Sequence, residues 1–416
     1  MDLGLYGIYL CLFLGLYFEV FLFISFFEKV PEKKTVRHPK RYPSVSMIVP
    51  CFNEEKTLAG TVESLLAMNY PKDKLEVLIV DDGSTDNTRN IGEALAKKHP
   101  HIQFFSKENG GKWTALNFGI PHSKGELIGC LDADSFVAKD ALLEVVKKFE
   151  DSPKADAMVP VMKVLAPKNL LELMQSAEYT FGIFVKKTFD NLAAISVLPG
   201  PFSIYRKEVF SKIGLFKHAH NTEDMEMAFR MHANHLHIEN AHTAVVYTKV
   251  PDTLRKLLKQ RTRWSQGFLQ NSGDYSHLYF NPKFGDFGVL VLPFGLALFL
   301  GALYSSGYLL YQILSTLVTK SYNIWTSGVV VWPTFSIEHL SWFYLNTSML
   351  TFLIICVASM TLAAILIGRR VAGADFGIAT LLSYFMLYGF IAPLWLARAA
   401  WGTLWSRETV WDSSHK

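Results

Sequence analysis

Two carboxylates one residue apart follow an apolar stretch of the chain, at Asp132 and Asp134 in the segment ELIGCLDADS. Alternate residues of an extended segment can both reach one hard cation, and two carboxylates leave coordination positions for phosphate oxygens and water. A single Asp after a strand is also common in ordinary turns. The position after a buried strand favours a site for Mg²⁺ or Mn²⁺ with Asp134 and Asp132 as ligands.

Three further polar clusters follow apolar runs in the same part of the chain. They contain carboxylates, amides and a lysine, which are groups that can bind a polar ligand. Turn formation alone is a poor explanation for four such clusters that are predicted to lie on one rim of a sheet. Their members are Pro50, Asn53 and Glu54, then Asp81 and Asp82, and finally Gly110, Gly111, Lys112 and Asn117.

Strand-like and helix-like runs alternate around these clusters. Strands are expected at 44–50, 75–80, 102–106 and 126–131, with helical spacing at 54–68 and 85–98. This alternation predicts an α/β domain with a mostly parallel, Rossmann-like sheet. Ligands bind beyond the carboxyl ends of the strands in such sheets, so we expect the four clusters to share one site.

Two later segments add candidates to this site. The segment LPGPFSIYR contains Gly200, at which the backbone can approach a ligand closely. In NTEDME, Asp224 stands at the start of a helical pattern. A carboxylate in that position often only caps the helix, so a structural role for Asp224 remains the alternative to a functional one.

Residues 254–268 have the pattern of a basic amphipathic helix. Gln260, Arg263 and Trp264 are spaced by three and four residues, so they share one face of that helix. A membrane-surface helix is the alternative to a ligand-binding helix, and we expect this segment to be both. A second stripe at 170–184 is typical either of a core helix or of a helix in the membrane interface.

Composition restricts the class of protein. The chain has 416 residues, of which 50% are hydrophobic and 19% charged, less than the roughly 25% charge of soluble domains. High hydrophobicity with low net charge excludes intrinsic disorder. The formal net charge of +4 gives no argument for nucleic acid, so no nucleic-acid partner is expected. The cysteines and the histidines between 218 and 242 match no zinc-ligand spacing.

Several almost uncharged runs are long enough to cross a bilayer of about 30 Å. They lie at 3–27, 289–318, 345–368 and 376–397. The division that they predict is an N-terminal transmembrane helix at 1–28, a soluble domain at 29–287 and a C-terminal transmembrane region at 288–416. Within the soluble domain, interface helices are expected at about 169–189 and 253–272.

Basic residues predict the orientation of these spans. Lysines and arginines are concentrated between 29 and 41, and Arg369 and Arg370 follow the third span. Because cytoplasmic flanks carry an excess of basic residues, the soluble domain is expected in the cytosol. Simple alternation puts the C-terminus outside, but Arg398 argues for a segment that is re-entrant or interfacial. The side of the C-terminus therefore stays open.

Taken together, the sequence resembles the membrane-embedded family 2 glycosyltransferases, and in particular their processive branch. The segments VDDGS, LDADS, TED and QRTRW match the family's D, DxD, D and QxxRW pattern, over about residues 44–273. GGKWTALN, GPFSIYR and QRTRWSQG are most similar to the poly-N-acetylglucosamine, hyaluronan and chitin-oligosaccharide synthases. TED and QRxRW are also shared with cellulose and mannan synthases. The resemblance implies a GT-A fold and an inverting transfer from a nucleotide sugar.

On the donor side, the resemblance implies that Asp82 binds the base and that Glu54 helps at the nucleoside. Asp132 would then face the diphosphate, and Asp134 would hold the metal. These roles come from the family pattern and not from the spacing alone.

On the acceptor side, the resemblance implies that Asp224 is the general base. Gln260, Arg263 and Trp264 would close over the diphosphate and the acceptor. The complete set of candidates comprises the catalytic residues Asp224, Asp132 and Arg263, the nucleotide-sugar-binding residues Pro50, Glu54, Asp81, Asp82, Lys112, Asp132, Gln260, Arg263 and Trp264, and the metal ligands Asp134 and Asp132.

The expected function is transfer of a sugar from a UDP-sugar, with UDP-N-acetylglucosamine as a candidate, to a growing β-linked polysaccharide at the cell (inner) membrane. The alternative is a single transfer to a membrane lipid acceptor. The intact acids disfavour a catalytically dead sensor or scaffold, and the scarcity of ionisable residues in the spans disfavours a transporter. Expected partners are the nucleotide-sugar donor, a carbohydrate or lipid-linked acceptor, the lipid bilayer, and export or accessory subunits.

Overall fold

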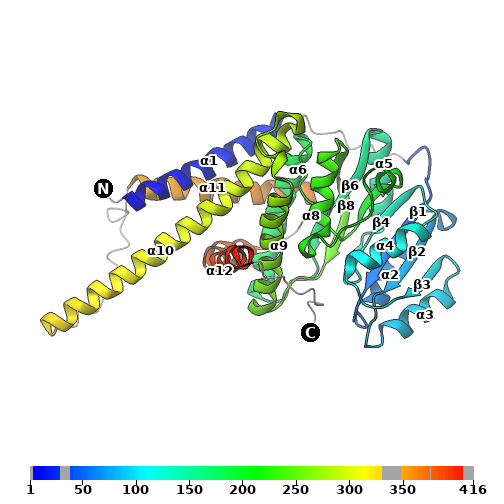
Figure 1. The fold of residues 1–416 in the computed structure, drawn as a ribbon, viewed down its shortest axis with the longest axis horizontal. Helices are drawn as coiled ribbons and strands as arrows, with labels where there is room; N and C mark the ends of the chain where they lie inside the picture. Colours follow the sequence, from blue (N-terminus) through cyan, green and yellow to red (C-terminus); the bar gives the residue numbers. More distant parts are fainter. Residues whose placement is uncertain (1–2, 29–37, 330–347, 375, 406–416) are drawn as a thin grey trace.

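The structure, a computed structural model, describes residues 3–28, 38–329, 348–374 and 376–405. A mixed β-sheet covered by helices forms one end of the molecule, and long helices extend from the other end (Figure 1). Two amphipathic helices lie between these two parts. The site described below lies at this junction.

Four parallel strands form the first half of the sheet. They are β1 (Val45–Cys51), β2 (Leu75–Asp81), β3 (Ile102–Ser106) and β4 (Leu127–Cys130), with the connecting helices α2 (Leu58–Leu66), α3 (Thr88–Lys98) and α4 (Lys112–His122). Helices cover both faces of these strands, which explains why every residue of β1 is buried and apolar runs are nearly continuous. The predicted parallel α/β arrangement is confirmed here.

The second half of the sheet is mixed. Its strands are β5 (Ser135–Val137), β6 (Ala155–Val164), β7 (Ser203–Arg206) and β8 (His237–Thr248). β7 runs antiparallel to both β4 and β6, whereas β6 and β8 are parallel, and the order across the sheet is β3-β2-β1-β4-β7-β6-β8-β5. The sequence analysis identified none of these four strands. β5 and β7 have three and four residues, which is too short for a clear apolar pattern.

The remaining elements of this domain are short helices around the sheet. They are α5 (Ala141–Asp151), α7 (Glu208–Ile213), α8 (Glu223–Ala233) and the single turns η1 (Lys72–Lys74), η2 (Ala219–Asn221), η3 (Ser276–Leu278) and η4 (Pro282–Phe284).

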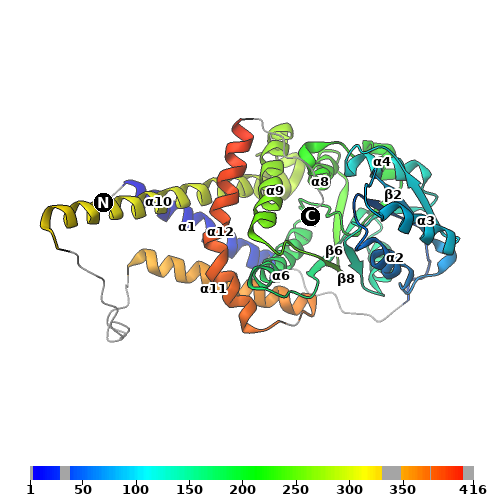
Figure 2. The same cartoon turned by 90° about the horizontal axis from the view of Figure 1, so that it is seen from below.

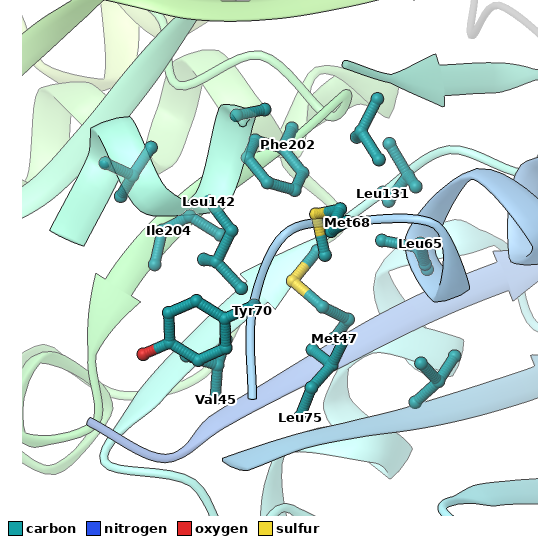
Figure 3. Close-up of a cluster of buried hydrophobic side chains, with 14 of the residues drawn as sticks. Val45, Met47, Leu65, Met68, Tyr70, Leu75, Leu131, Leu142, Phe202 and Ile204 are labelled. Carbon is teal, nitrogen blue, oxygen red and sulfur yellow. The ribbon is translucent and has the colours of Figure 1, made fainter. Parts of the chain in front are cut away.

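One core cluster lies between the sheet and helices α2 and α5, and a second lies between the sheet and helices α4, α7 and α8. Met47 on β1, Leu65 on α2 and Leu142 on α5 are completely buried and meet in one cluster (Figure 3). At its margin, the Tyr70 hydroxyl donates to the carbonyl of Pro43 at 2.6 Å, so the only polar atom of that side chain is satisfied. This packing holds the ends of β1 and β4, from which the polar clusters project.

The helix predicted at 54–68 is shorter than expected, because α2 begins at Leu58. The amides of Thr57 and Leu58 donate to the carbonyl of Glu54 at 3.1 and 3.0 Å, which closes a turn directly after β1. Asn53 adopts a positive φ of 56° before this turn. Glu54 therefore lies at the end of the strand and not on the helix.

Two amphipathic helices, α6 (Leu170–Asn191) and α9 (Leu254–Asp274), lie close to the helices of the apolar region. Asn169 caps α6 and forms a capping box with Glu172, and Thr253 caps α9. α6 contacts the long apolar helices α11 (Met349–Ala372) and α12 (Ile378–Leu404), and α9 contacts α12. The helix that contains the stripe at 170–184, α6, therefore packs both on the domain and on the apolar helices.

Within the described residues, four helical segments are long and apolar enough to cross a membrane. They are α1 (Leu3–Glu28), the segment Phe287–Ser327 that joins the π-helical turn η5 (Phe287–Val291) to α10 (Leu292–Ser327), and the helices α11 and α12. Figures 1 and 2 show that α12 crosses α1, α10 and α11 at a steep angle: it is seen end-on in Figure 1 and from the side in Figure 2.

Candidate active site

A cavity of about 1400 Å³ lies between the carboxyl end of the first half of the sheet and helices α6, α9 and α12. It brings together residues that are far apart in the sequence. Nine of the eleven predicted site residues line it, namely Pro50, Glu54, Lys112, Asp132, Asp134, Asp224, Gln260, Arg263 and Trp264. The two that are not among its lining residues are Asp81 and Asp82.

Asp82 is buried beside this cavity and organises a loop. Its carboxylate accepts hydrogen bonds from the backbone amides of Gly110 and Gly111 at 3.1 and 2.8 Å, and the Lys107 ammonium lies 2.6 Å away. Asp81 accepts from the Ser84 amide and the Ser106 hydroxyl. Such charge-assisted bonds fix the loop before α4, and therefore the position of the next residue that enters the cavity.

That residue is Lys112, in the first turn of α4. Its ammonium lies 2.5 Å from Asp132 Oδ1 and 3.7 Å from Glu223 Oε1. Burial disfavours the charged amine, but the nearby carboxylates of Asp132, Glu223 and Asp224 outweigh it and raise the pKa of Lys112. Lys112 is therefore a fixed positive charge at the end of β4.

Gly200 lies against this ion pair. A Cβ atom at this position would collide with the Lys112 ammonium and the Asp132 carboxylate. A side chain at this position would have to displace these two groups, so Gly200 lets the backbone lie directly against the ion pair.

The two carboxylates of the DxD segment both face the cavity, with Asp134 Oδ1 accepting from the Ser135 hydroxyl at 3.0 Å. Among the described residues, no group of three or more His, Cys, Asp and Glu side chains has the geometry of a metal site. This donor set fits Mg²⁺ or Mn²⁺, which commonly take one or two carboxylates and complete their coordination with phosphate oxygens and water. It does not fit a closed structural zinc site.

Asp224 lies in the first turn of α8, where Thr222 and not Asp224 occupies the N-cap position. The capping alternative is therefore wrong, although Asp224 Oδ1 accepts from the adjacent Met225 amide at 2.9 Å. Burial, and next the charge of Glu223, raise the pKa of Asp224 to about 6 against the opposing charges of Lys112 and Arg263. A carboxylate with such a pKa is a competent base near neutral pH.

Helix α9 supplies one wall of the cavity. Gln260, Arg263 and Trp264 line it as their spacing predicts, and Arg263 Nη1 donates to the carbonyl of Asn221 just before α8. The sequence analysis gave Arg261 no role beyond its place in the basic helix. In the structure its side chain is 3% exposed, and its guanidinium stacks on the ring of Trp264.

Other cavity residues also escaped the sequence analysis. Burial lowers the pKa of Lys186 to about 8, against the attraction of Asp224. The cavity residues that the sequence analysis did not assign to the site are Glu178, Tyr179, Gly182 and Lys186 on α6, Glu223 on α8, and Tyr388 and Arg398 on α12. No local sequence pattern identifies these residues as site residues, because they become neighbours only when α6 and α12 pack against the domain.

Comparison with known proteins assigns this arrangement to a family. Residues 46–214, from β1 to the end of α7, match the model of glycosyl transferase family 2. The chain contains a family 2 glycosyltransferase domain. Asp224 and the α9 residues lie beyond the matched range and are placed next to the family 2 domain by the fold.

Curated relatives of this chain are named poly-beta-1,6-N-acetyl-D-glucosamine synthase. The chain is 32% identical to the Staphylococcus epidermidis protein and 31% identical to the Staphylococcus aureus (strain COL) protein, each over 224 residues. The match covers 54% of this chain and 54% of each relative, so it spans about half the length of the curated relatives.

One solved structure is similar to almost the entire chain. It is a mannosyltransferase from Pyrobaculum calidifontis in complex with GDP-Man and Mn²⁺, with a TM-score of 0.60, 19% identity, and coverage of 97% of this chain and 99% of that one. At this identity the similarity establishes the fold. The predicted class, a GT-A domain joined to a region of long apolar helices, is confirmed.

Proposed function

We propose that the protein transfers a sugar, with inversion, from a UDP-sugar to a growing β-linked polysaccharide at a membrane. The observation that carries this proposal is the single cavity in which Asp224 faces Lys112, Arg263 and the Asp132–Asp134 pair. The names of the curated relatives support UDP-N-acetylglucosamine as the donor and a β-1,6 linkage as the first to test. The cavity also supplies room for an acceptor beside the donor.

In the proposed reaction, an acceptor hydroxyl oxygen attacks the anomeric carbon of the donor. Asp224 takes the hydroxyl proton, the new glycosidic bond forms, and the bond from the anomeric carbon to the diphosphate breaks. The electron pair of that bond leaves with UDP. One carboxylate on the acceptor side is sufficient, because a single displacement inverts the anomeric carbon.

Lys112 and Arg263 are placed to stabilise the leaving diphosphate. Both are cations on the cavity wall, and fixed charges in a water-excluded site stabilise developing negative charge strongly. Asp134 and Asp132 would hold Mg²⁺ or Mn²⁺, which would supply Lewis-acid stabilisation of the same phosphates when bound. The structural neighbour with Mn²⁺ supports this choice of ion.

Trp264 and Gln260 are proposed to hold the acceptor. A flat indole offers an apolar face to a sugar ring and one polar N–H at its edge. Asp81 and Asp82 are proposed to act on the nucleoside side, with Glu54 and Pro50 at the cavity wall, although Asp82 already binds the loop at 107–111.

A single transfer to a lipid acceptor is the second candidate. Arg255 and Lys259 on α9 and Arg398 on α12 line the cavity beside the apolar helices. Such cations suit the phosphate of a lipid-linked acceptor that enters from the membrane. In both cases we place the family 2 domain on the cytosolic face, where nucleotide sugars are made.

The test is incubation of the full-length protein in nanodiscs with a panel of radiolabelled nucleotide sugars and Mn²⁺ or Mg²⁺. Incorporation of N-acetylglucosamine into a product that lengthens with time supports the synthase. A product that stops at one sugar on a lipid supports the second candidate. Absence of transfer from every donor rejects both.

A further inference from the structure

The cavity continues along one face of α6, away from Trp264. Glu178, Gly182 and Lys186 all line it, and their spacing of four residues places them in one row along the helix. Trp264 is linked to the Glu178 end of this row through Arg261, whose Nη2 donates to Glu178 Oε2 at 2.7 Å. Lys186, at the other end, lines the same cavity as Asp224. The row therefore borders the space in which the acceptor hydroxyl is proposed to lie.

Gly182 in the middle of this row has no structural explanation among the described residues. It lies within the helix Leu170–Asn191, where glycine is less favourable than alanine. A Cβ atom at Gly182 would meet nothing within 4 Å, and its φ is not in the left-handed region. Close helix packing or a turn would require glycine, but neither is present here. A glycine at this position leaves open space on the cavity wall, which a methyl group would reduce.

Two polar side chains lie together at the Lys186 end. Lys186 Nζ donates to the carbonyl of Pro160 at 3.4 Å, and Asn240 Nδ2 donates to the preceding carbonyl, that of Val159, at 3.1 Å. β6 is irregular at this point, with a shift in register to β8 between Pro160 and Val161. Irregularities of this kind often re-aim side chains next to active sites.

Asn240 has an unused acceptor. The residue is 1% exposed and lines the cavity, and its Oδ1 is buried without a hydrogen-bond partner in the part of the chain that the structure describes. Buried polar atoms without partners are rare in native proteins and call for a specific explanation. A donor on a ligand would satisfy this oxygen after a small movement of the side chain.

Apolar side chains also line the cavity on the two elements that carry the Lys186 contact. They are Val161 on β6 and Ile183 on α6, which belong to one buried cluster. A hydrogen-bond donor, a hydrogen-bond acceptor and an apolar surface together match a secondary amide that carries a small alkyl group. The amide carbonyl would accept from Lys186, its N–H would donate towards Asn240, and the alkyl group would lie against Val161 and Ile183.

We propose that Gly182, Lys186 and Asn240 form an acceptor subsite that recognises the N-acyl group of an amino sugar, with Gly182 leaving space for the sugar ring. This inference rests on the proposed transfer to a carbohydrate acceptor and specifies the class of that acceptor. No covalent step is involved. The contribution of Lys186 is a hydrogen bond, so a neutral isostere removes it.

Two substitutions test the subsite, each with a matched control. Gly182→Ala adds one methyl group to the cavity wall, and Gly307→Ala makes the same change in α10, where the added Cβ also meets nothing within 4 Å. Lys186→Met removes the amine, and Lys97→Met makes the same change at an exposed lysine in the last turn of α3, which does not line the cavity. The ligands are a β-1,6-linked N-acetylglucosamine trimer and the corresponding glucose trimer, with the full-length protein in nanodiscs and UDP present.

We expect the wild-type protein to bind the N-acetylglucosamine trimer at least tenfold more tightly than the glucose trimer. Gly182→Ala should weaken binding of both trimers at least tenfold while the melting temperature stays the same or rises. Lys186→Met should weaken only the N-acetylglucosamine trimer and so remove the preference. UDP affinity and both control variants should match the wild type. A purely structural role for Gly182 cannot combine unchanged stability with lost binding.

Three results would overturn the subsite: equal binding of the two trimers by the wild type, wild-type binding by Gly182→Ala, or an intact preference in Lys186→Met. Failure of the proposed function appears differently, as absence of transfer from every nucleotide sugar in the wild type. Trimer binding remains measurable in that case, so the two failures are distinguishable.

Discussion

The Arg261 guanidinium carbon lies 4.1 Å from the centroid of the Trp264 ring, while Nη2 of the same group donates to Glu178 Oε2 at 2.7 Å. A guanidinium stacks well on an indole face and presents a fixed fork of donors. Arg261 Nη1 also lies 3.1 Å from Gln260 Oε1. One buried side chain therefore connects both proposed acceptor-holding residues of α9 to α6.

This connection predicts that Arg261 acts as a positioning residue. Arg261→Lys keeps the charge but loses the planar stack, so Trp264 should become mobile. We expect about a tenfold rise in acceptor KM and shorter products, with a smaller change in the KM for the donor. Product length on a gel and UDP release, measured side by side, are the readouts.

Two further variants separate positioning from folding. Glu178→Gln retains an acceptor oxygen and should keep most of the activity, whereas Glu178→Ala leaves a buried charge unpaired and should destabilise the protein by about 3–5 kcal/mol. Arg89→Lys, on the exposed face of α3 and away from the cavity, is the matched control. Normal product length in Arg261→Lys would exclude the positioning role.

Much of the donor side can be predicted from local sequence. β3 has the bounds expected from the sequence, and no end of β1, β2 or β4 differs from its expected position by more than one residue. These strands are predictable because their apolar runs are buried on both faces. Polar residues directly after such strands must emerge on one rim. Asp132, Asp134 and Lys112 are therefore found together as predicted.

The acceptor side depends on contacts between distant segments. Glu178 and Lys186 are polar residues within an apolar stripe, and their sequence neighbours give no sign that α9, β6 and β8 will face them. Asp82 shows a different limit of prediction from sequence. The sequence correctly places it at the rim of the sheet, but only the structure shows that its carboxylate accepts from the amides of Gly110 and Gly111. Spacing identifies candidate groups, whereas burial and partners determine which of them face the cavity.

The pKa of Asp224 gives a pH prediction. The base must be deprotonated to accept the hydroxyl proton, and the pKa of Asp224 is raised to about 6, mainly by burial. Transfer should therefore rise with pH through about 6 and then level off, with kcat/KM falling about tenfold per pH unit below that value.

Asp224→Asn should reduce transfer by about 10²–10⁴-fold and remove this acid limb, because an amide takes no proton. UDP affinity should stay within about twofold of the wild type when measured by calorimetry, since the base acts on the acceptor. An active Asp224→Asn enzyme with the wild-type pH profile would show that another group is the base.

Metal removal tests the Asp132–Asp134 pair. Excess EDTA should abolish transfer, and Mn²⁺ should restore it in the wild type. At a concentration one hundred times its Kd, Mn²⁺ that binds only the folded state stabilises it by about 2.7 kcal/mol. Asp134→Asn should lose both the activity and this thermal shift, while the exposed Asp73→Asn should lose neither. Full activity in EDTA would exclude the metal site.

The last prediction concerns the side of the membrane on which α12 ends. α11 reaches α6 at its C-terminal end, where a Cβ atom at Gly368 would collide with the backbone carbonyl of Thr180, so α12 begins near the family 2 domain. At the other end of α12, a Cβ at Gly402 would lie 2.8 Å from Gln266 Oε1 on α9, so this end is also beside the domain.

Both ends of α12 therefore lie close to the domain, and the helix crosses the other apolar helices at a steep angle (Figure 2). We expect α12 to lie along the membrane interface with Trp405 on the cytosolic side, which suits the exposed Arg398. The measurement is labelling of intact cells with an impermeant maleimide. Trp405→Cys, Lys97→Cys and Thr319→Cys are each made on a background without Cys11 and Cys356, in which the two remaining cysteines, Cys51 and Cys130, are buried.

Only Thr319→Cys, near the far end of α10, should be labelled from outside. Trp405→Cys and Lys97→Cys should react only after the membrane is permeabilised. The physical reason is that a helix held along its length by α6 and α9 cannot also cross the bilayer. Labelling of Trp405→Cys from outside, together with protection of Lys97→Cys, would show that α12 spans the membrane and that its packing on α9 differs in the bilayer.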